Sequence, residues 1–282
     1  MKKGLNIDLT KLLKSDIKNH YDIEVFLADR LRNAESNERK NLYKTVYNEL
    51  FNRVPKHPQL IDKKTSDKRL KRVASEMILI NSFISKKTVF LEIGAGDCAL
   101  SKEVSKVVQK VVSIDVSPEI FNNLKLPNNV QTKLTDGINI PAKCNTIDIV
   151  YSNQLMEHLH PDDALENVKN IYISLRKNGK YICITPNKFN GPHDVSKFFD
   201  LEPKGLHLKE YTNKELIKIF KNAGFSKLKT YFYIRDELFN CPIFIVLFLE
   251  MVLLLLHSSL RIYFAKLMPF RELLGIRMVA IK

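Results

Sequence analysis

The sequence lacks the cysteine pattern of a secreted or zinc-stabilised protein. Its 282 residues contain four cysteines, and no two of them form a Cys-x-x-Cys pair. The N-terminal residues do not resemble a secretory signal. We therefore expect a reducing, cytoplasmic setting, with neither a disulfide framework nor a cysteine-bound zinc ion.

The sequence also lacks an apolar run long enough to cross a membrane. Residues 241–256 carry one charge, Glu250, but this run is shorter than the about 20 residues that a transmembrane helix needs. The charged residues Arg261, Lys266 and Arg271 make residues 260–274 a costly returning span. We therefore expect residues 241–274 to form a helical hairpin, either as a lid over a cleft or as a peripheral contact in a membrane interface.

Arginine is scarce relative to lysine. The net charge is +14, but only 11 of the 45 basic residues are arginine, and the lysines are spread along the chain. This distribution disfavours an arginine-rich nucleic-acid patch. The excess positive charge still favours an anionic partner, such as a phospholipid surface or a phosphorylated substrate.

A short apolar run that ends in glycines carries the strongest functional signal. Val89–Ile93 has the length of a buried strand, Gly94, Ala95 and Gly96 follow it, and a helical pattern begins at Ala99. Such a turn lets backbone N–H groups approach a ligand closely. A second apolar run ends at Asp115, about twenty residues further on, which is the spacing that brings a carboxylate to a ribose diol.

The residues around these glycines distinguish between two cofactor classes. A dinucleotide site needs a pyrophosphate beside the helix, which the carboxylate of Asp97 would repel, and Glu92 favours a cationic ligand. The stretch Glu92-Ile-Gly94-Ala-Gly96 resembles the first motif of class I S-adenosylmethionine-dependent methyltransferases, although Cys98 replaces the third glycine. The resemblance implies S-adenosylmethionine as the cofactor. It covers residues 85 to 235 and implies binding roles for Glu92, Gly94, Ala95 and Gly96.

Further positions match this family in the expected order. The resemblance implies that Asp115 binds the ribose hydroxyls and that Val116 packs on the adenine. Asp136, with Gly137 beside it, matches the acid that reads the adenine amino group. Asn153 follows the fourth predicted strand, where the methionine part and the acceptor meet in the family.

Strands and helices alternate from Thr88 to Thr185, which predicts a parallel sheet with helices on both faces. The fold class is therefore α/β, a doubly wound, mostly parallel sheet, and the resemblance implies seven strands with the last one antiparallel beside the fifth. We expect four segments: a helical N-terminal cap (1–70), the cofactor-binding core (71–235), the apolar helical hairpin (236–274) and a closing strand (275–282).

Histidines after the fourth and fifth strands are the catalytic candidates. Glu157-His158 resembles the Glu-x-x-Glu-His stretch of ubiquinone-type O-methyltransferases, which supports a divalent metal there. Gln154 replaces the first glutamate, so no metal site is predicted, and His158 is a candidate base. Its alternative role is to orient the following helix together with Glu157. His193 is a second candidate base, with Asp194 beside it as the orienting carboxylate.

Three functions are consistent with these observations. The first is an O-methyltransferase for a small, lipid-linked or sugar-containing acceptor. The second is an RNA methyltransferase that uses the basic N-terminal helices, but Ser152-Asn-Gln-Leu155 lacks the Asn/Asp-Pro-Pro-Tyr type of tetrapeptide that stacks an extruded base. The third is a catalytically silent adapter that uses the apolar hairpin to bind a partner.

Overall fold

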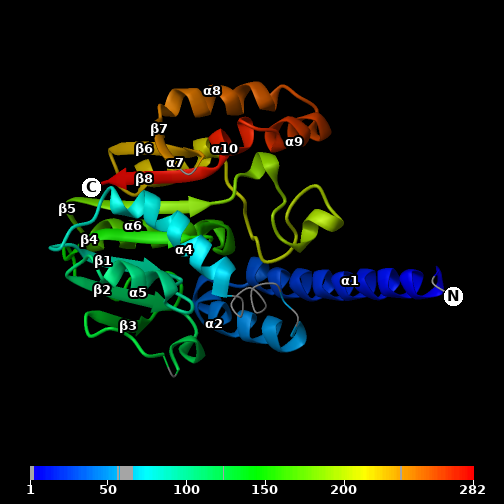
Figure 1. Ribbon diagram of the computed structural model, residues 1–282, viewed down its shortest axis with the longest axis horizontal. Helices are drawn as coiled ribbons and strands as arrows, with labels where there is room; N and C mark the ends of the chain where they lie inside the picture. The colour runs from blue at the N-terminus through cyan, green and yellow to red at the C-terminus, as the bar shows by residue number, and fades with distance from the viewer. Residues whose placement is uncertain (1–2, 56, 58–65, 123, 236) are drawn as a thin grey trace.

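An open eight-stranded sheet forms the centre of the molecule (Figure 1). The computed structural model describes residues 3–55, 57, 66–122, 124–235 and 237–282. The strand order is β3-β2-β1-β4-β5-β8-β6-β7. In chain order the strands are β1 (Val89–Ile93), β2 (Lys110–Asp115), β3 (Val130–Leu134), β4 (Ile147–Asn153), β5 (Leu175–Thr185), β6 (Lys227–Ile234), β7 (Glu237–Cys241) and β8 (Ile276–Ile281).

Strand direction follows the prediction closely. Strands β1 to β5 are mutually parallel, and β8 lies antiparallel between β5 and β6. The mostly parallel α/β fold is therefore confirmed. The predicted strand number was too low by one, because β7 pairs antiparallel with β6 and becomes the edge of the sheet. Residues 237–241 of the predicted helical hairpin (236–274) are therefore a strand, and the segment is not wholly helical.

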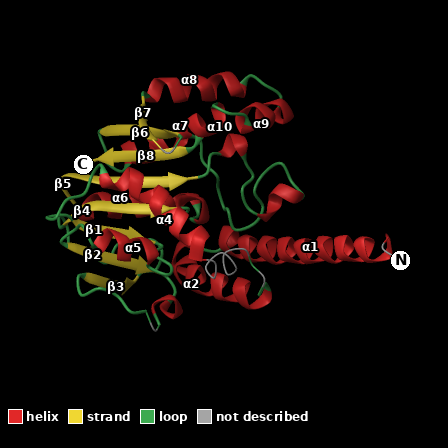
Figure 2. Cartoon of the chain, viewed as in Figure 1, coloured by secondary structure: helices red, strands yellow, loops and turns green. Residues whose placement is uncertain are grey.

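Helices cover both faces of the sheet, as Figure 2 shows. Helix α2 begins with a capping box formed by Glu35 and Glu38. It is held to α6 by a buried ion pair in which Arg39 Nε lies 2.6 Å from an oxygen of Asp163. The helices are α1 (Lys3–Asn33), α2 (Ser36–Arg53), α4 (Ser66–Asn81), α5 (Ala99–Ser105), α6 (Pro161–Ser174), α7 (Asn213–Asn222), α8 (Ile243–Leu254), α9 (Ser258–Lys266) and α10 (Phe270–Leu274).

The two faces of the sheet bury separate apolar clusters. The larger cluster includes Leu27 of α1 and Leu50 of α2 together with Leu91 of β1, so the N-terminal helices share the main core. The cluster on the other face includes Phe90, which alternates with Leu91 along the strand, and Ile80 of α4. The N-terminal helices are thereby fixed beside the carboxyl ends of the parallel strands (Figure 1).

Helices α8, α9 and α10 form a third, smaller cluster. Its buried members are Phe189, Leu253, Ala265 and Leu274. Phe189 belongs to η3 (Lys188–Asn190), a short 3₁₀ turn after β5, so the apolar segment is packed against the loop at the carboxyl end of that strand. Within the described chain, no helix combines the length and the apolar character that crossing a membrane would require.

Candidate active site

The glycine turn after β1 has the backbone geometry that the sequence predicted. Gly94 and Gly96 have φ values of 71° and 52°, a region that glycine enters at little cost. Cys98, which stands in place of the third glycine, also has a positive φ of 55°. A Cβ placed on Gly96 would meet no heavy atom within 4 Å, so open space lies beside the turn. The turn therefore has room for a ligand to approach the backbone.

Asp115 is brought to this turn by the parallel pairing of β1 and β2. Its Oδ2 accepts a hydrogen bond of 3.0 Å from the N–H of Gly96, and its Oδ1 accepts one of 3.2 Å from the N–H of Ser117. The predicted proximity of the glycines and this carboxylate is thus present. Its contact with a ribose stays a prediction.

Glu92 lies beneath the turn and points toward α5. Its carboxyl group accepts a hydrogen bond from Ser101, whose hydroxyl also contacts that of Ser113 at 2.6 Å. Burial raises the pKa of Glu92 to about 8, although the bond from Ser101 opposes the shift. At neutral pH the group is therefore largely protonated, because its surroundings penalise the charged form. The predicted contact of Glu92 with a cationic ligand stays a prediction.

The remaining predicted cofactor residues are spread over three strand ends. The carboxylate of Asp136 accepts bonds from the backbone N–H groups of Ile138 and Asn139, at 3.0 and 2.7 Å. Burial opposes them, but these bonds hold the pKa of Asp136 below its ordinary value. Gly137 has a φ of 88° and faces the ring of Tyr43, and Val116 packs against the main core. Contacts of these residues with adenine stay predictions.

Helix α4 adds charged residues that the sequence patterns did not identify. Glu76 accepts a hydrogen bond of 2.7 Å from Asn153 Nδ2, and its Oε1 lies 3.7 Å from Arg72 Nε. Arg69 and Arg72 lie 3.5 and 3.7 Å from the carboxylate of Asp97. The helix thereby places two cations beside the glycine turn. Nothing in the spacing of Arg69 and Arg72 alone predicts this, since it depends on how α4 packs on the sheet.

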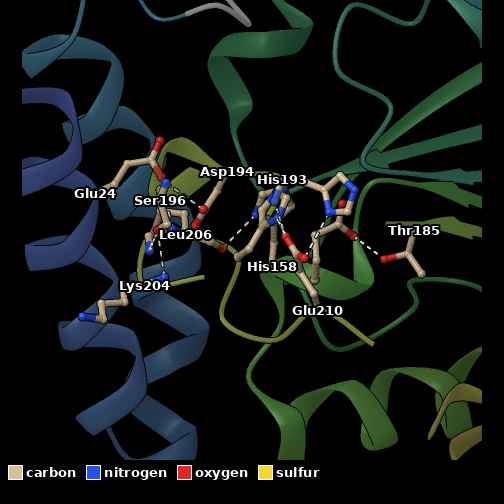
Figure 3. A network of polar contacts seen from close by, with 12 residues as sticks. Glu24, His158, Thr185, His193, Asp194, Ser196, Lys204, Leu206 and Glu210 are labelled. Carbon is tan, nitrogen blue, oxygen red and sulfur yellow. Dashed lines mark hydrogen bonds and ion pairs between the residues drawn. The ribbon is translucent and has the colours of Figure 1, made fainter. Parts of the chain in front are cut away.

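Glu210 joins two histidines in the loop that follows β5 (Figure 3). His193 Nδ1 lies 3.0 Å from Glu210 Oε2, and His207 Nδ1 lies 2.8 Å from Oε1. Burial opposes ionisation, but the bonds from both histidines lower the pKa of Glu210 to about 2. The carboxylate therefore accepts from both rings. His193 is partly exposed and keeps its Nε2 free of this contact.

Asp194 does not orient His193, contrary to the prediction. Its Oδ1 accepts a bond of 2.9 Å from the N–H of Ser196 and caps the turn η4 (Val195–Phe198). Its Oδ2 is buried without a hydrogen-bond partner among the described residues. Adjacent residues in an extended chain point in different directions, so Asp194 cannot reach the ring of His193. The carboxylate that contacts this ring comes from Glu210.

His158 occupies the other side of the same cluster (Figure 3). Its Nδ1 lies 2.9 Å from the carbonyl oxygen of Leu206, and its ring meets that of His207 edge-on at 4.9 Å. Burial lowers the pKa of His158 to about 3, so the ring is neutral. A neutral ring whose Nδ1 donates to a carbonyl leaves Nε2 as an acceptor. Among the described residues, His158 and His193 are thus brought into one polar network.

Two groups of side chains in the described chain have donor atoms suited to a divalent metal. Glu157, His158 and His207 form one group, and His20, Glu24 and His57 form the other, each with donor atoms within 4.8 Å of one another. Glu157 also accepts a hydrogen bond of 2.8 Å from Thr185, and burial raises its pKa to about 7. The prediction that no metal binds beside Gln154 stays a prediction.

The second of these groups, His20, Glu24 and His57, was not identified from the sequence. His20 and Glu24 lie four residues apart on α1, with Nε2 and Oε1 2.6 Å apart, and His57 Nε2 is 3.6 Å from the same oxygen. Glu24 Oε2 accepts a hydrogen bond of 3.2 Å from the N–H of Leu206, the residue whose carbonyl contacts His158. The i, i+4 spacing of His20 and Glu24 was the available signal.

An open hollow of about 710 Å³ lies at the opposite edge of the sheet. It is lined by residues at the amino ends of β1, β2 and β3, among them Val89, Lys110 and Val130. The glycine turn and the histidines lie at the carboxyl ends of the parallel strands, where ligands bind in open α/β sheets. The hollow is therefore separate from the candidate active site.

The chain is similar to known methyltransferases in sequence and in fold. The family model described as "Methyltransferase domain" matches residues 36–230. No curated protein matches the sequence. A SAM-dependent methyltransferase from Archaeoglobus fulgidus is 15% identical, with 80% of this chain and 100% of that chain covered and a TM-score of 0.53.

Two other solved structures are similar at the level of the fold. A chain from the complex between the Haloferax volcanii Trm112 methyltransferase activator and a proposed methyltransferase is 13% identical, with coverages of 78% and 92% and a TM-score of 0.54. A proposed O-methyltransferase from Nostoc punctiforme is 16% identical, with coverages of 78% and 59% and a TM-score of 0.52. At such identities the similarity shows a shared fold.

Proposed function

Because the chain belongs to the class I S-adenosylmethionine-dependent methyltransferases, we propose that it methylates a hydroxyl oxygen of a small, lipid-linked or sugar-containing acceptor. The observation that carries this proposal is the bridge from His193 to His207 through Glu210. A hydroxyl group is a weak nucleophile and needs a base to remove its proton. A histidine held by a buried carboxylate is such a base.

The cofactor, when bound, supplies a methyl group on a positively charged sulfur. The glycine turn and Asp115 are suited to hold its nucleoside part. Arg69 and Arg72, which lie beside Asp97, would offer cations to its carboxylate. Asn153, which is anchored to Glu76, lies between this region and the histidines along the chain. These residues position the donor, and positioning supplies much of the rate in a displacement between two bound reactants.

The proton transfer is assigned to His193. Its Nδ1 donates to the ionised Glu210, so Nε2 is left with a lone pair directed away from the carboxylate. S-adenosylmethionine, when bound, would donate its methyl group to the acceptor oxygen and leave as S-adenosylhomocysteine. The hydroxyl proton then passes to Nε2 of His193. Glu210 stabilises the positive charge that develops on the ring.

The apolar helices after β7 support a lipid-linked acceptor. Several large apolar side chains of α8 and α9 are exposed, and α9 packs against η3, in the loop that continues to His193. A peripheral membrane position would present such an acceptor to this loop. All four cysteines are unpaired, which agrees with the proposed cytoplasmic setting.

Titration with S-adenosylhomocysteine, followed by transfer of a labelled methyl group, tests the proposal. Binding should be lost in Asp115→Ala, with Asp148→Ala as a control at the other end of the sheet. Purified protein would then be incubated with labelled cofactor and separate lipid, glycan and RNA fractions. Label in an O-methyl group of the lipid or glycan fraction supports the proposal. Label in RNA would establish the RNA methyltransferase alternative instead, and binding without transfer to any fraction would favour the adapter.

A further inference from the structure

Apart from Glu250, helix α8 is apolar on every side, yet only one side is buried. The inward face carries Val246, Glu250 and Leu253, which are 2%, 3% and 3% exposed. The opposite face carries Phe244, Phe248, Met251 and Leu255, which lie four, three and four residues apart and therefore share one side of the helix. Their exposed fractions are 71%, 61%, 53% and 83%.

Glu250 explains which side of α8 faces the protein. Its Oε1 accepts hydrogen bonds from the side-chain amide of Asn187 at 3.1 Å and from the N–H of Asn213 at 2.6 Å. Its Oε2 accepts one of 3.1 Å from the N–H of Lys214, at the start of α7. A buried carboxylate with several N–H donors fixes the rotation of a helix, because removing it from these donors is costly. The apolar outer face is thus held outward.

The exposed apolar surface continues onto α9. We define the apolar ridge as the exposed large hydrophobic residues of this segment. They are Phe244, Ile245, Phe248, Met251, Val252, Leu254, Leu255, Leu260, Tyr263, Phe264, Leu267 and Met268. More than half of the exposed large hydrophobic residues of the described chain belong to the ridge, so they are concentrated in this segment.

The charges around the ridge indicate the kind of partner. Glu250 is the only acidic residue in the sequences of α8 and α9, and it is buried. Lys266 on α9 and Arg271 on α10 are exposed, and Arg271 Nε lies 3.5 Å from the partly buried Glu272. Arg261 is itself partly buried, with its guanidinium 5.8 Å from the ring of Phe189. A patch with apolar and aromatic residues, flanked by basic residues and lacking exposed acids, matches the boundary between the acyl chains and the headgroups of an anionic bilayer.

The size of the helices indicates how they would meet a bilayer. The 12 residues of α8 extend only about 18 Å, whereas the hydrocarbon core is about 30 Å thick. A connected helix of nine residues, α9, follows in the chain. The pair is therefore suited to lie in the plane of the interface.

We propose that the apolar ridge is a docking surface for an anionic phospholipid bilayer. Docking would hold the loop from Asn187 to His193 directly behind the membrane-bound helices, because Asn187 is hydrogen-bonded to Glu250 on the inward face of α8 and Phe189 packs against α9. The ridge would thus select acceptors that reside in the membrane. This last consequence rests on the proposed function, whereas docking itself does not.

Vesicle sedimentation of the full chain tests the docking without any acceptor. The wild type is expected to sediment with phosphatidylcholine vesicles that contain phosphatidylglycerol, and more weakly with phosphatidylcholine alone. Phe244→Ser/Phe248→Ser should lower the partition coefficient about tenfold or more. The control Leu134→Ser/Ile173→Ser changes two exposed apolar residues outside the ridge and should bind as the wild type does. Unchanged S-adenosylhomocysteine binding would show that each variant is folded.

Two outcomes would overturn the docking proposal. One is equal vesicle binding by the wild type and Phe244→Ser/Phe248→Ser. The other is no vesicle binding by the wild type. If sedimentation velocity then finds a dimer that Phe244→Ser/Phe248→Ser abolishes, the ridge binds a second copy of the chain instead of a bilayer. Failure of methyl transfer leaves the vesicle result unaffected, so the two proposals fail independently.

Discussion

His193 makes two separate contacts with Glu210. Its backbone N–H donates to Oε1 at 2.7 Å, and its ring Nδ1 lies 3.0 Å from Oε2. One carboxylate therefore fixes both the main chain and the imidazole of this residue. A ring held in this way has a defined tautomer, and its free Nε2 has a defined direction, which is what a general base requires.

Glu210→Gln is expected to lower kcat for methyl transfer about 100-fold, because the amide cannot stabilise a protonated His193. S-adenosylhomocysteine affinity should be unchanged. The pKa of His207 is a second readout, and it can be measured without a methyl acceptor. Burial opposes its protonation, but the bond to Glu210 raises its pKa, so NMR titration should find a lower value in the variant. Glu202→Gln, at an exposed site, is the control. A kcat equal to that of the wild type would contradict the assignment of His193.

Glu24→Gln is expected to remove stability at neutral pH. Burial raises the pKa of Glu24, but bonds from His20 and His57 outweigh it and lower the value from 4.5 to about 2. The folded pKa lies below the unfolded one, so this contribution is complete above pH 4.5 and is lost as the pH falls toward 2. It amounts to on the order of 3 kcal/mol at pH 7.

Urea unfolding as a function of pH measures this effect. The difference in unfolding free energy between the wild type and Glu24→Gln should shrink across the acidic range. Asp29→Asn lies on the same helix at an exposed site and should change little. If the difference in unfolding free energy stayed constant as the pH fell toward 2, an ionised Glu24 could not be its cause.

Glu92→Gln is expected to have the opposite pH dependence. Burial raises the pKa of Glu92 to about 8, with Ser101 opposing the shift. The folded pKa lies above the unfolded one, so the contribution is complete below pH 4.5 and is lost as the pH rises through 8. A neutral glutamine avoids this loss, so the variant should be more stable than the wild type at alkaline pH, by on the order of a few kcal/mol. Denaturant unfolding, with Glu103→Gln on α5 as control, tests this. Parallel pH profiles for the variant and the wild type would refute it.

Gly205→Ala is expected to destabilise the protein, because Gly205 lies in a loop that contacts α1 and leads to His207. A Cβ at this position would lie 2.4 Å from Glu24 Oε2 and 2.7 Å from Asp194 Oδ2. Both carboxylates are buried and cannot move away freely, so we expect a loss of about 1–3 kcal/mol. Thermal unfolding would be compared with Lys204→Ala, which changes an exposed neighbour. A midpoint unaltered by Gly205→Ala would mean that the carboxylates adjust.

Local patterns predicted much of the fold because they encode strand burial and turn geometry. The apolar run that ends at Gly94 and the one that ends at Asp115 are neighbouring parallel strands, as their sequence indicated. The edge strand β7 was missed, since Glu237–Cys241 has one buried residue and lacks the alternation of a half-buried strand. Its pairing with β6 depends on the hairpin that joins them.

The polar network of the site was predicted only in part. His158 and His193 were identified because they follow the ends of parallel strands. Glu210 was not paired with His193, since 17 residues separate them and the loop path decides which carboxylate arrives. His20 and Glu24 were missed because α1 reaches the site only after it packs against the sheet.

The sequence by itself determined the cofactor class and the parallel sheet, because a glycine turn and a carboxylate at the next strand end act within a short, locally encoded unit. Only the tertiary structure decided the partners of buried charges. Glu250 illustrates the difference: along the chain it is an acid inside an apolar run, and in the fold it accepts N–H bonds that turn one face of α8 outward. Such pairings are set by packing, since a buried charge is stable only where distant segments supply its partners.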